Sequence, residues 1–109
     1  MYYKVAVVCH PGPNWNPESP VTKQTMEVFT RFMVKLDREG VLVLAGEWGE
    51  GGVIYVLNVP SKEKVEQIMS EDPAIQSGIF RAEAQSFNPL ISHSIGDFNN
   101  VVIQRSGSF

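Results

Sequence analysis

The sequence predicts a single α+β domain with an antiparallel sheet, and three observations point to this class. Apolar runs typical of strands lie at the start, in the middle and towards the end of the 109 residues. Two of the intervening segments carry apolar residues at helical spacing. Along the chain the elements come in the order strand, helix, strand, strand, helix, strand. Because crossover connections are right-handed, this order predicts a ferredoxin-like βαββαβ sandwich with the helices on one face of the sheet.

The first part of the chain is expected to form a strand, a long loop and a helix. Residues 2–9 are rich in β-branched and aromatic side chains and end at a cluster of proline and glycine, which predicts a buried strand. Residues 10–20 contain four prolines, a glycine and a tryptophan, a composition typical of a loop. Residues 21–39 place their apolar side chains on one side of a helix, and Gly40 is expected to end it in the left-handed conformation.

The second part is expected to contain a hairpin, a short helix and a last strand. Residues 41–45 and 53–59 are apolar runs joined by a glycine-rich turn. Ser61 is a suitable N-cap for a short helix. Residues 79–87 are expected to form the fourth strand, and residues 89–109 a tail that contains a further strand at 101–104.

Bulk composition limits the classes of function. The net charge is −3, and the few cations are scattered, whereas nucleic-acid binding needs a concentrated basic surface. The first apolar run is too short for a signal peptide or a membrane span, and the one cysteine excludes an internal disulfide. We therefore expect one cytoplasmic domain over residues 1–109 that has a small-molecule substrate and binds neither nucleic acid nor membrane.

The predicted strands are apolar on both faces, which indicates that the sheet is covered on both sides. In the first strand Val5 and Val7 alternate with Ala6 and Val8, so neither face is polar. The two helices cover one face only, and a large exposed apolar patch is unfavourable in a monomer. A second copy of the chain is the simplest cover, so we expect a homodimer. The tail from residue 88 to 109 could instead cover part of this face or reach across to the partner.

Two residues are candidates for acid–base chemistry. Asp72 stands before Pro73, a pairing that opens a turn of helix. Two roles are therefore open for Asp72, that of a structural helix cap and that of a general base. His10 lies at the end of the first strand, and histidine is a residue type that can shuttle protons, although a histidine at a strand end is also common as a surface residue. No set of residues has the spacing of a metal site, so no metal is expected.

Aromatic residues are the candidates for the walls of a ligand pocket. Trp15 and Trp48 are expected on loops, where they either cap the core or form a flat wall for a ring-shaped ligand. Phe29 has the spacing of a core residue, and Tyr55 could offer a hydroxyl from the third strand.

Several segments from Phe29 to about Leu90 resemble the YCII-related proteins. They are EGVLVLAG at residues 39–46, the glycine pair at 51–52 and, most specifically, EDPAIQSGIFRAE at residues 71–83. The opening HPGPNW resembles a loop of one branch of this family. The resemblance implies the dimeric α+β barrel group, which also holds muconolactone isomerase-like enzymes.

The resemblance also implies a histidine–aspartate pair that is incomplete in this chain. Asp72 matches the aspartate, but Phe29 stands where the family has the histidine of its first helix. One hypothesis is a cofactor-independent lyase or isomerase acting on a cyclic or hydroxylated aromatic catabolite. It would use Asp72 and His10 as catalytic residues, and its substrate-binding residues would be Trp15, Phe29, Trp48, Tyr55 and Pro73. The alternative is a dimeric, non-catalytic ligand-binding or accessory domain.

Overall fold

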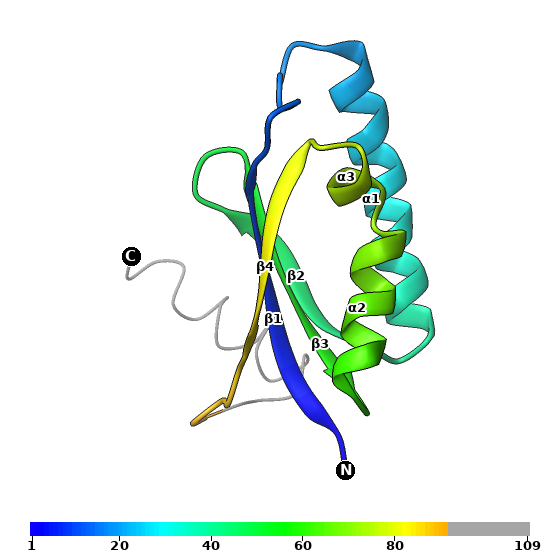
Figure 1. Ribbon diagram of the computed structural model, residues 1–109, viewed down its shortest axis with the longest axis vertical. Helices are drawn as coiled ribbons and strands as arrows, with labels where there is room; N and C mark the ends of the chain where they lie inside the picture. Colours follow the sequence, from blue (N-terminus) through cyan, green and yellow to red (C-terminus); the bar gives the residue numbers. More distant parts are fainter. Residues whose placement is uncertain (92–109) are drawn as a thin grey trace, which may run out of the picture.

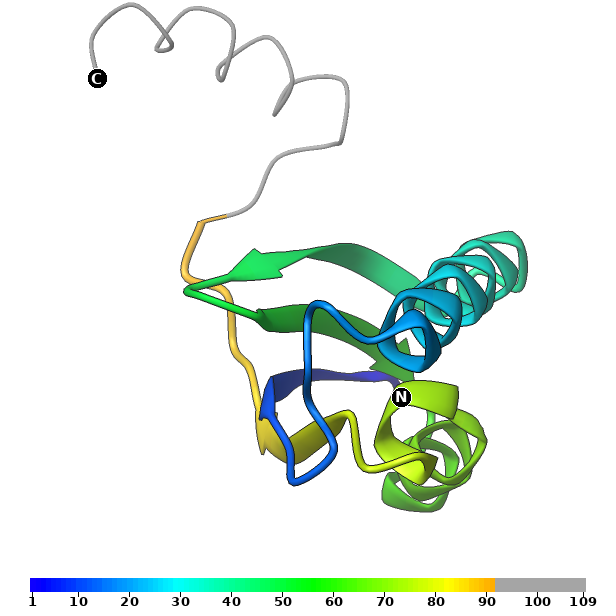
Figure 2. The same cartoon turned by 90° about the horizontal axis from the view of Figure 1, so that it is seen from above.

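Four strands form one antiparallel sheet in the order β2-β3-β1-β4, and all helices lie on one side of it (Figures 1 and 2). The computed structural model describes residues 1–91. Its elements are β1 (Tyr3–Pro11), α1 (Pro20–Arg38), β2 (Leu42–Trp48), β3 (Gly52–Val59), α2 (Lys62–Glu71), α3 (Pro73–Gln76) and β4 (Phe80–Ser86). The predicted βαββαβ fold is confirmed, with the single turn α3 added before the last strand.

Two predicted boundaries are wrong in ways that affect the site. The strand β1 continues through His10 and Pro11, which were expected in the loop. The strand β2 continues to Trp48, so this tryptophan lies on a strand and the hairpin turn is shorter than expected. The proposed strand at residues 101–104 lies outside the described residues.

The helix α1 begins and ends as its sequence predicts. The Ser19 hydroxyl accepts a hydrogen bond from the Val21 backbone N–H at 3.2 Å, and Pro20 occupies the first helical position. Gly40 follows the helix with φ of +76°, the left-handed conformation that glycine adopts without steric cost. The buried side chains Phe29, Met33 and Leu36 form its apolar stripe.

The core lies between the helices and the sheet. Strand residues alternate between the two faces, and cross-strand partners share a face. Val7 pairs with Tyr55 and Cys9 with Val53, and all four side chains are buried on the helix side. The opposite side, here called the open face, carries Ala6, Val8 and His10 of β1, Ile54 and Val56 of β3, Leu44 and Trp48 of β2, and Glu83 of β4.

None of the helices in residues 1–91 combines the length and apolar character needed to cross a membrane.

Candidate functional site

Asp72 is a carboxylate sealed in the core, with both oxygens engaged. Its Oδ1 accepts hydrogen bonds from the backbone N–H groups of Ala74 at 2.9 Å and Ile75 at 3.3 Å, which caps α3. Its Oδ2 accepts a hydrogen bond from the Tyr55 hydroxyl at 2.8 Å. Asp72 and Tyr55 are both 0% exposed to solvent. The capping role that the sequence predicted for Asp72 is therefore present, together with a partner that it did not predict.

The pKa values of this buried group follow from loss of hydration. Burial raises the pKa of Asp72, and the hydrogen bonds from Tyr55 and the α3 backbone partly offset the rise. Burial and the neighbouring Asp72 charge also raise the pKa of Tyr55, and the same two causes raise the pKa of the Cys9 thiol to about 12. Tyr55 and Asp72 thus form a hydrogen-bonded pair that has no contact with solvent.

Phe29 of α1 packs against the ring of Tyr55, one member of this pair. Its ring centroid lies 6.1 Å from that of Tyr55 and 5.6 Å from that of Phe80, in an edge-on arrangement with the latter. Phe29 is 5% exposed. The position where the resemblance implies a histidine is therefore filled by a phenyl ring, which can neither accept nor donate a proton.

The HPGPNW segment docks on the connection between α3 and β4. The Gly12 backbone N–H donates to the Ile79 carbonyl at 2.7 Å, and the Asn14 side-chain amide donates to the Ser77 carbonyl at 2.8 Å. These bonds place Trp15 in a stack with Phe80, with 6.1 Å between ring centroids and 22° between planes. Two segments that carried the family resemblance, far apart in the sequence, thus meet at one edge of the core.

A groove with aromatic walls lies beside this edge, between α1 and β2. Two cavities of about 200 and 250 Å³ share Met26, Glu47 and Val53 in their walls, and we call them together the α1–β2 groove. Trp15 and Phe80 line the first cavity and Phe29 the second. The carboxylate in these walls is that of Glu47. All of these lining residues belong to a single chain.

Sequence reasoning missed Glu47 because it placed this residue in the hairpin turn. In the structure β2 is longer, and Glu47 pairs with Val53, whose side chain faces the helices. The Glu47 side chain therefore lies on the helix side of the sheet. No sequence signal gave this placement, because residues 41–45 are apolar on both faces and the strand has a register irregularity between Leu42 and Leu44.

His10 and Trp48 lie on the other side of the sheet. His10 neighbours the buried Cys9 on β1 and so faces the open side, where its Nε2 is 3.8 Å from Oε1 of Glu83. Trp48 pairs with Gly52 and is half exposed on the same face. The sheet separates both residues from Asp72. The expected pocket that joins Asp72 to His10 and to both tryptophans is therefore not formed within one chain.

Of the remaining predicted residues, Trp15 and Phe29 lie in the α1–β2 groove, whereas Tyr55 lies beneath it with Asp72. Pro73 lines a separate shallow cavity between α1 and the α2–α3 junction, beside Arg31 and Phe32. Within residues 1–91, no three cysteine, histidine or acidic side chains gather as they would around a metal ion.

Comparison with known proteins identifies the family. The family model of the YCII-related domain matches residues 3–84. The chain belongs to the YCII-related family. The resemblance noted in the sequence is thereby confirmed, and it extends to β1 and the loop that follows. No curated protein matches this YCII-related chain significantly.

A solved structure with the same fold is that of 5-chloro-2-hydroxyhydroquinone dehydrochlorinase (TftG) from Burkholderia phenoliruptrix AC1100, in complex with 2,5-dihydroxybenzoquinone. The TM-score is 0.53 and the sequence identity 14%, over 77% of the present chain and 93% of the dehydrochlorinase. At this identity the likeness establishes a shared fold.

Proposed function

We propose that this YCII-related chain binds a small, planar, hydroxylated ring compound in the α1–β2 groove, and that it lacks the proton-transfer pair of its family. The observation that carries the proposal is Phe29: its phenyl ring, 6.1 Å from the Tyr55 ring, stands where the resemblance implies the histidine, and the Tyr55–Asp72 hydrogen bond is sealed in the core. A base with 0% exposure, both of whose oxygens are engaged, is not positioned to reach a substrate.

The groove has the composition of a ligand site. Its walls are largely apolar and aromatic, with one carboxylate, and such a mixture is typical of pockets that hold small organic molecules. A ring can pack against Trp15 and Phe80, and Glu47 can accept hydrogen bonds from ring hydroxyls. The quinone bound to the dehydrochlorinase of the same fold supports this class of ligand.

A second candidate is a cofactor-independent lyase or isomerase of aromatic catabolism. Two observations favour it: Asp72 has a raised pKa, as a general base near neutral pH requires, and the solved relative in fold is a dehydrochlorinase. In such an elimination the hydroquinone first passes to its keto form, in which the chlorine-bearing carbon gains a proton. The carboxylate then takes the proton of a remaining ring hydroxyl, the freed electrons form new C=O and C=C bonds, and the carbon–chlorine bond breaks to release chloride and a hydroxyquinone. Because Asp72 is 0% exposed, this route requires the packing around it to open.

The experiment that tests the proposal measures binding and turnover separately. In a Trp48→Phe background Trp15 is the remaining tryptophan, and we expect 2,5-dihydroxybenzoquinone to quench it saturably, with calorimetry confirming the affinity. Glu47→Gln should weaken binding of 5-chloro-2-hydroxyhydroquinone, whose ring hydroxyls stay protonated near neutral pH, about two- to tenfold through loss of a hydrogen bond to a charged acceptor. Glu50→Gln, which removes the same charge outside the groove, should not.

Turnover is followed as chloride release from 5-chloro-2-hydroxyhydroquinone in the absence of air. The binding proposal predicts release at the uncatalysed rate. If the protein catalyses chloride release and Asp72→Asn abolishes this catalysis, the binding proposal is wrong and the lyase candidate takes its place. Failure of both the quinone and the hydroquinone to bind would reject both candidates.

We further propose that the protein works as a cytoplasmic homodimer. The apolar side chains of the open face support a second copy as its cover, because Leu44 and Trp48 are each about half exposed in the single chain.

A further inference from the structure

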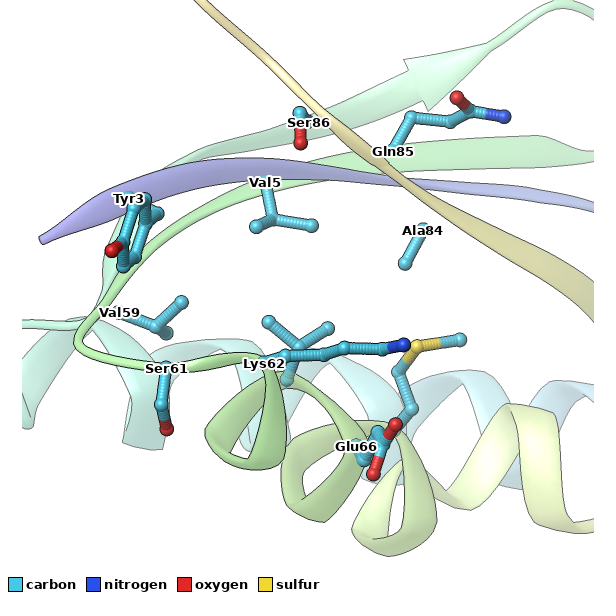
Figure 3. A pocket seen from close by; sticks show the side chains of 11 residues that line it. Tyr3, Val5, Val59, Ser61, Lys62, Glu66, Ala84, Gln85 and Ser86 are labelled. Carbon is cyan, nitrogen blue, oxygen red and sulfur yellow. The ribbon is translucent and has the colours of Figure 1, made fainter.

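A second cavity lies between α2 and the β4–β1 side of the sheet, and it shares no residue with the α1–β2 groove. Its volume is about 450 Å³. We call it the α2–β4 cavity. Its lining consists of Tyr3, Val5, Val59, Ser61, Lys62, Val65, Glu66, Met69, Ala84, Gln85 and Ser86 (Figure 3).

The cavity exists because β4 presents small side chains towards the helices. Ala84 pairs with Val7 and Ser86 with Val5, so both point to the helix side of the sheet. The helix α2 packs mainly against β3 and α3, through the buried side chains of Val65 and Ile68. No large side chain of β4 fills the space beside this helix, and the interior is left apolar.

The polar groups of the cavity lie at its edge, and one of them is a cation. Figure 3 shows the Lys62 side chain running along the gap between α2 and the strands. The Glu66 carboxylate points away from the strands in the same view. In residues 1–91 the ion pair is Lys35 with Glu39, and His10 lies near Glu83; neither contact involves Lys62.

We propose that the α2–β4 cavity binds a small monocarboxylic acid with an apolar body, such as a medium-chain or aromatic acid. The body lies against Val5, Val65 and Met69, and the carboxylate pairs with the Lys62 ammonium group. The volume falls within the range of about 300–1,000 Å³ that is usual for small-molecule sites. An amine of the same shape would meet the like charge of Lys62, and a neutral alcohol would gain only the apolar contact.

The test uses the full chain and two probes that differ only in the head group, octanoate and octanol. Methyl NMR should show octanoate shifting the signals of Val65, Met69 and Ala84, while those of Met26 and Val53 in the α1–β2 groove stay in place. Lys62→Gln should weaken octanoate binding about two- to fivefold, the range that exposed ion pairs give, and leave octanol unchanged. Lys64→Gln removes the same charge from the same helix outside the cavity, and it should change the affinity for neither octanoate nor octanol.

Ala84→Leu fills the cavity and should weaken the binding of both octanoate and octanol at least tenfold. The thermal unfolding midpoint of this variant checks that it is folded. If Ala84→Leu is unstable, the Lys62→Gln comparison alone decides, because that side chain is exposed. The proposal is overturned if octanoate shifts signals elsewhere in the protein, if it fails to bind at millimolar concentration, or if Lys62→Gln affects both probes equally. None of these outcomes bears on quinone binding in the α1–β2 groove.

Discussion

At the scale of single residues, the buried Asp72 links several elements of the fold through its side-chain hydrogen bonds. Its side chain joins three pieces of chain: it caps α3, follows α2 directly and accepts the Tyr55 hydroxyl from β3. A buried polar group that lacks a hydrogen-bond partner destabilises the folded state. Removing one partner of Asp72 therefore costs both the lost hydrogen bond and the burial of the group left unpaired.

Removing either partner of the Tyr55–Asp72 bond is expected to destabilise the protein. Asp72→Ala should lower the free energy of unfolding by about 2–4 kcal/mol, because it removes a helix cap and leaves the Tyr55 hydroxyl unpaired. Tyr55→Phe should lower it by about 1–3 kcal/mol through the lost bond to a carboxylate. Tyr3→Phe, at a half-exposed tyrosine, is the matched control and should stay within about 0.5 kcal/mol. Urea unfolding of the single variants and the double variant would contradict the assignment if the two effects were simply additive.

The raised pKa of Asp72 predicts how stability depends on pH. The pKa of Asp72 in the folded protein lies above its unfolded value of about 3.9. At pH values between these two pKa values, the folded state binds the proton more tightly than the unfolded state does. The contribution of Asp72 to stability is therefore fully present below about pH 4 and is lost as pH rises through the folded pKa. We expect the wild-type protein to lose stability relative to Asp72→Asn over this window, measured by urea unfolding at successive pH values. A wild-type protein that instead gained stability over this range would show that the hydrogen bonds outweigh burial.

Cys9 is expected to be inert in the folded protein. Burial raises the pKa of its thiol from 9.0 to about 12, which leaves about a thousandfold less thiolate than an ordinary thiol near neutral pH. Its side chain is also fully buried. Iodoacetamide should label this single cysteine rapidly in concentrated urea and negligibly in buffer. Rapid labelling of the folded protein would mean that the core beside Tyr55 opens readily.

At the scale of elements, the β2–β3 turn and the HPGPNW segment fit against each other. Gly51 has φ of +79°, and a Cβ atom added there would lie 2.9 Å from Cζ2 of Trp15. Trp15 in turn stacks on Phe80 at the start of β4. The turn therefore needs glycine at position 51 for two reasons: the backbone has a positive φ, and the Trp15 ring leaves no room for a side chain.

Gly49 provides the control that separates these reasons, since its φ is +60° and an added Cβ would meet nothing within 4 Å. Gly49→Ala should cost about 1 kcal/mol for the left-handed conformation alone. Gly51→Ala should cost about 2 kcal/mol or more and, in a Trp48→Phe background, shift the fluorescence of Trp15 to longer wavelength. Equal costs and unchanged fluorescence would show that Trp15 does not rest against the turn in solution.

At the scale of the whole molecule, the helices leave one side of the sheet without a cover of their own (Figure 2). This open face is apolar at its centre, where Val8 pairs with Ile54 and Ala6 with Val56. His10 and Glu83 lie near its edge. Such a surface favours association of two copies through their sheets.

The homodimer is expected to depend on the centre of this face. Light scattering after gel filtration should give twice the chain mass of 12.1 kDa for the wild type and the monomer mass for Ile54→Lys. Val28→Lys, at an exposed apolar position of α1, should remain dimeric. A wild-type protein of monomer mass would refute the proposal.

The sequence by itself determined the order of the elements and most of their ends. Ser61 caps α2 through the Lys64 backbone N–H, Gly40 ends α1, and Asp72 with Pro73 opens α3, all as predicted. These features depend on neighbours a few residues away, and local hydrogen bonds and backbone preferences decide them.

Only the tertiary structure decided which residues share a site. Because side chains alternate along a strand, a small error in a strand boundary changes the face to which a residue is assigned, as happened for Glu47 and Trp48. The Tyr55–Asp72 bond joins residues 17 positions apart, and Trp15 meets Phe80 across most of the chain. Such contacts depend on how the elements pack in space, and no short segment of the sequence encodes them.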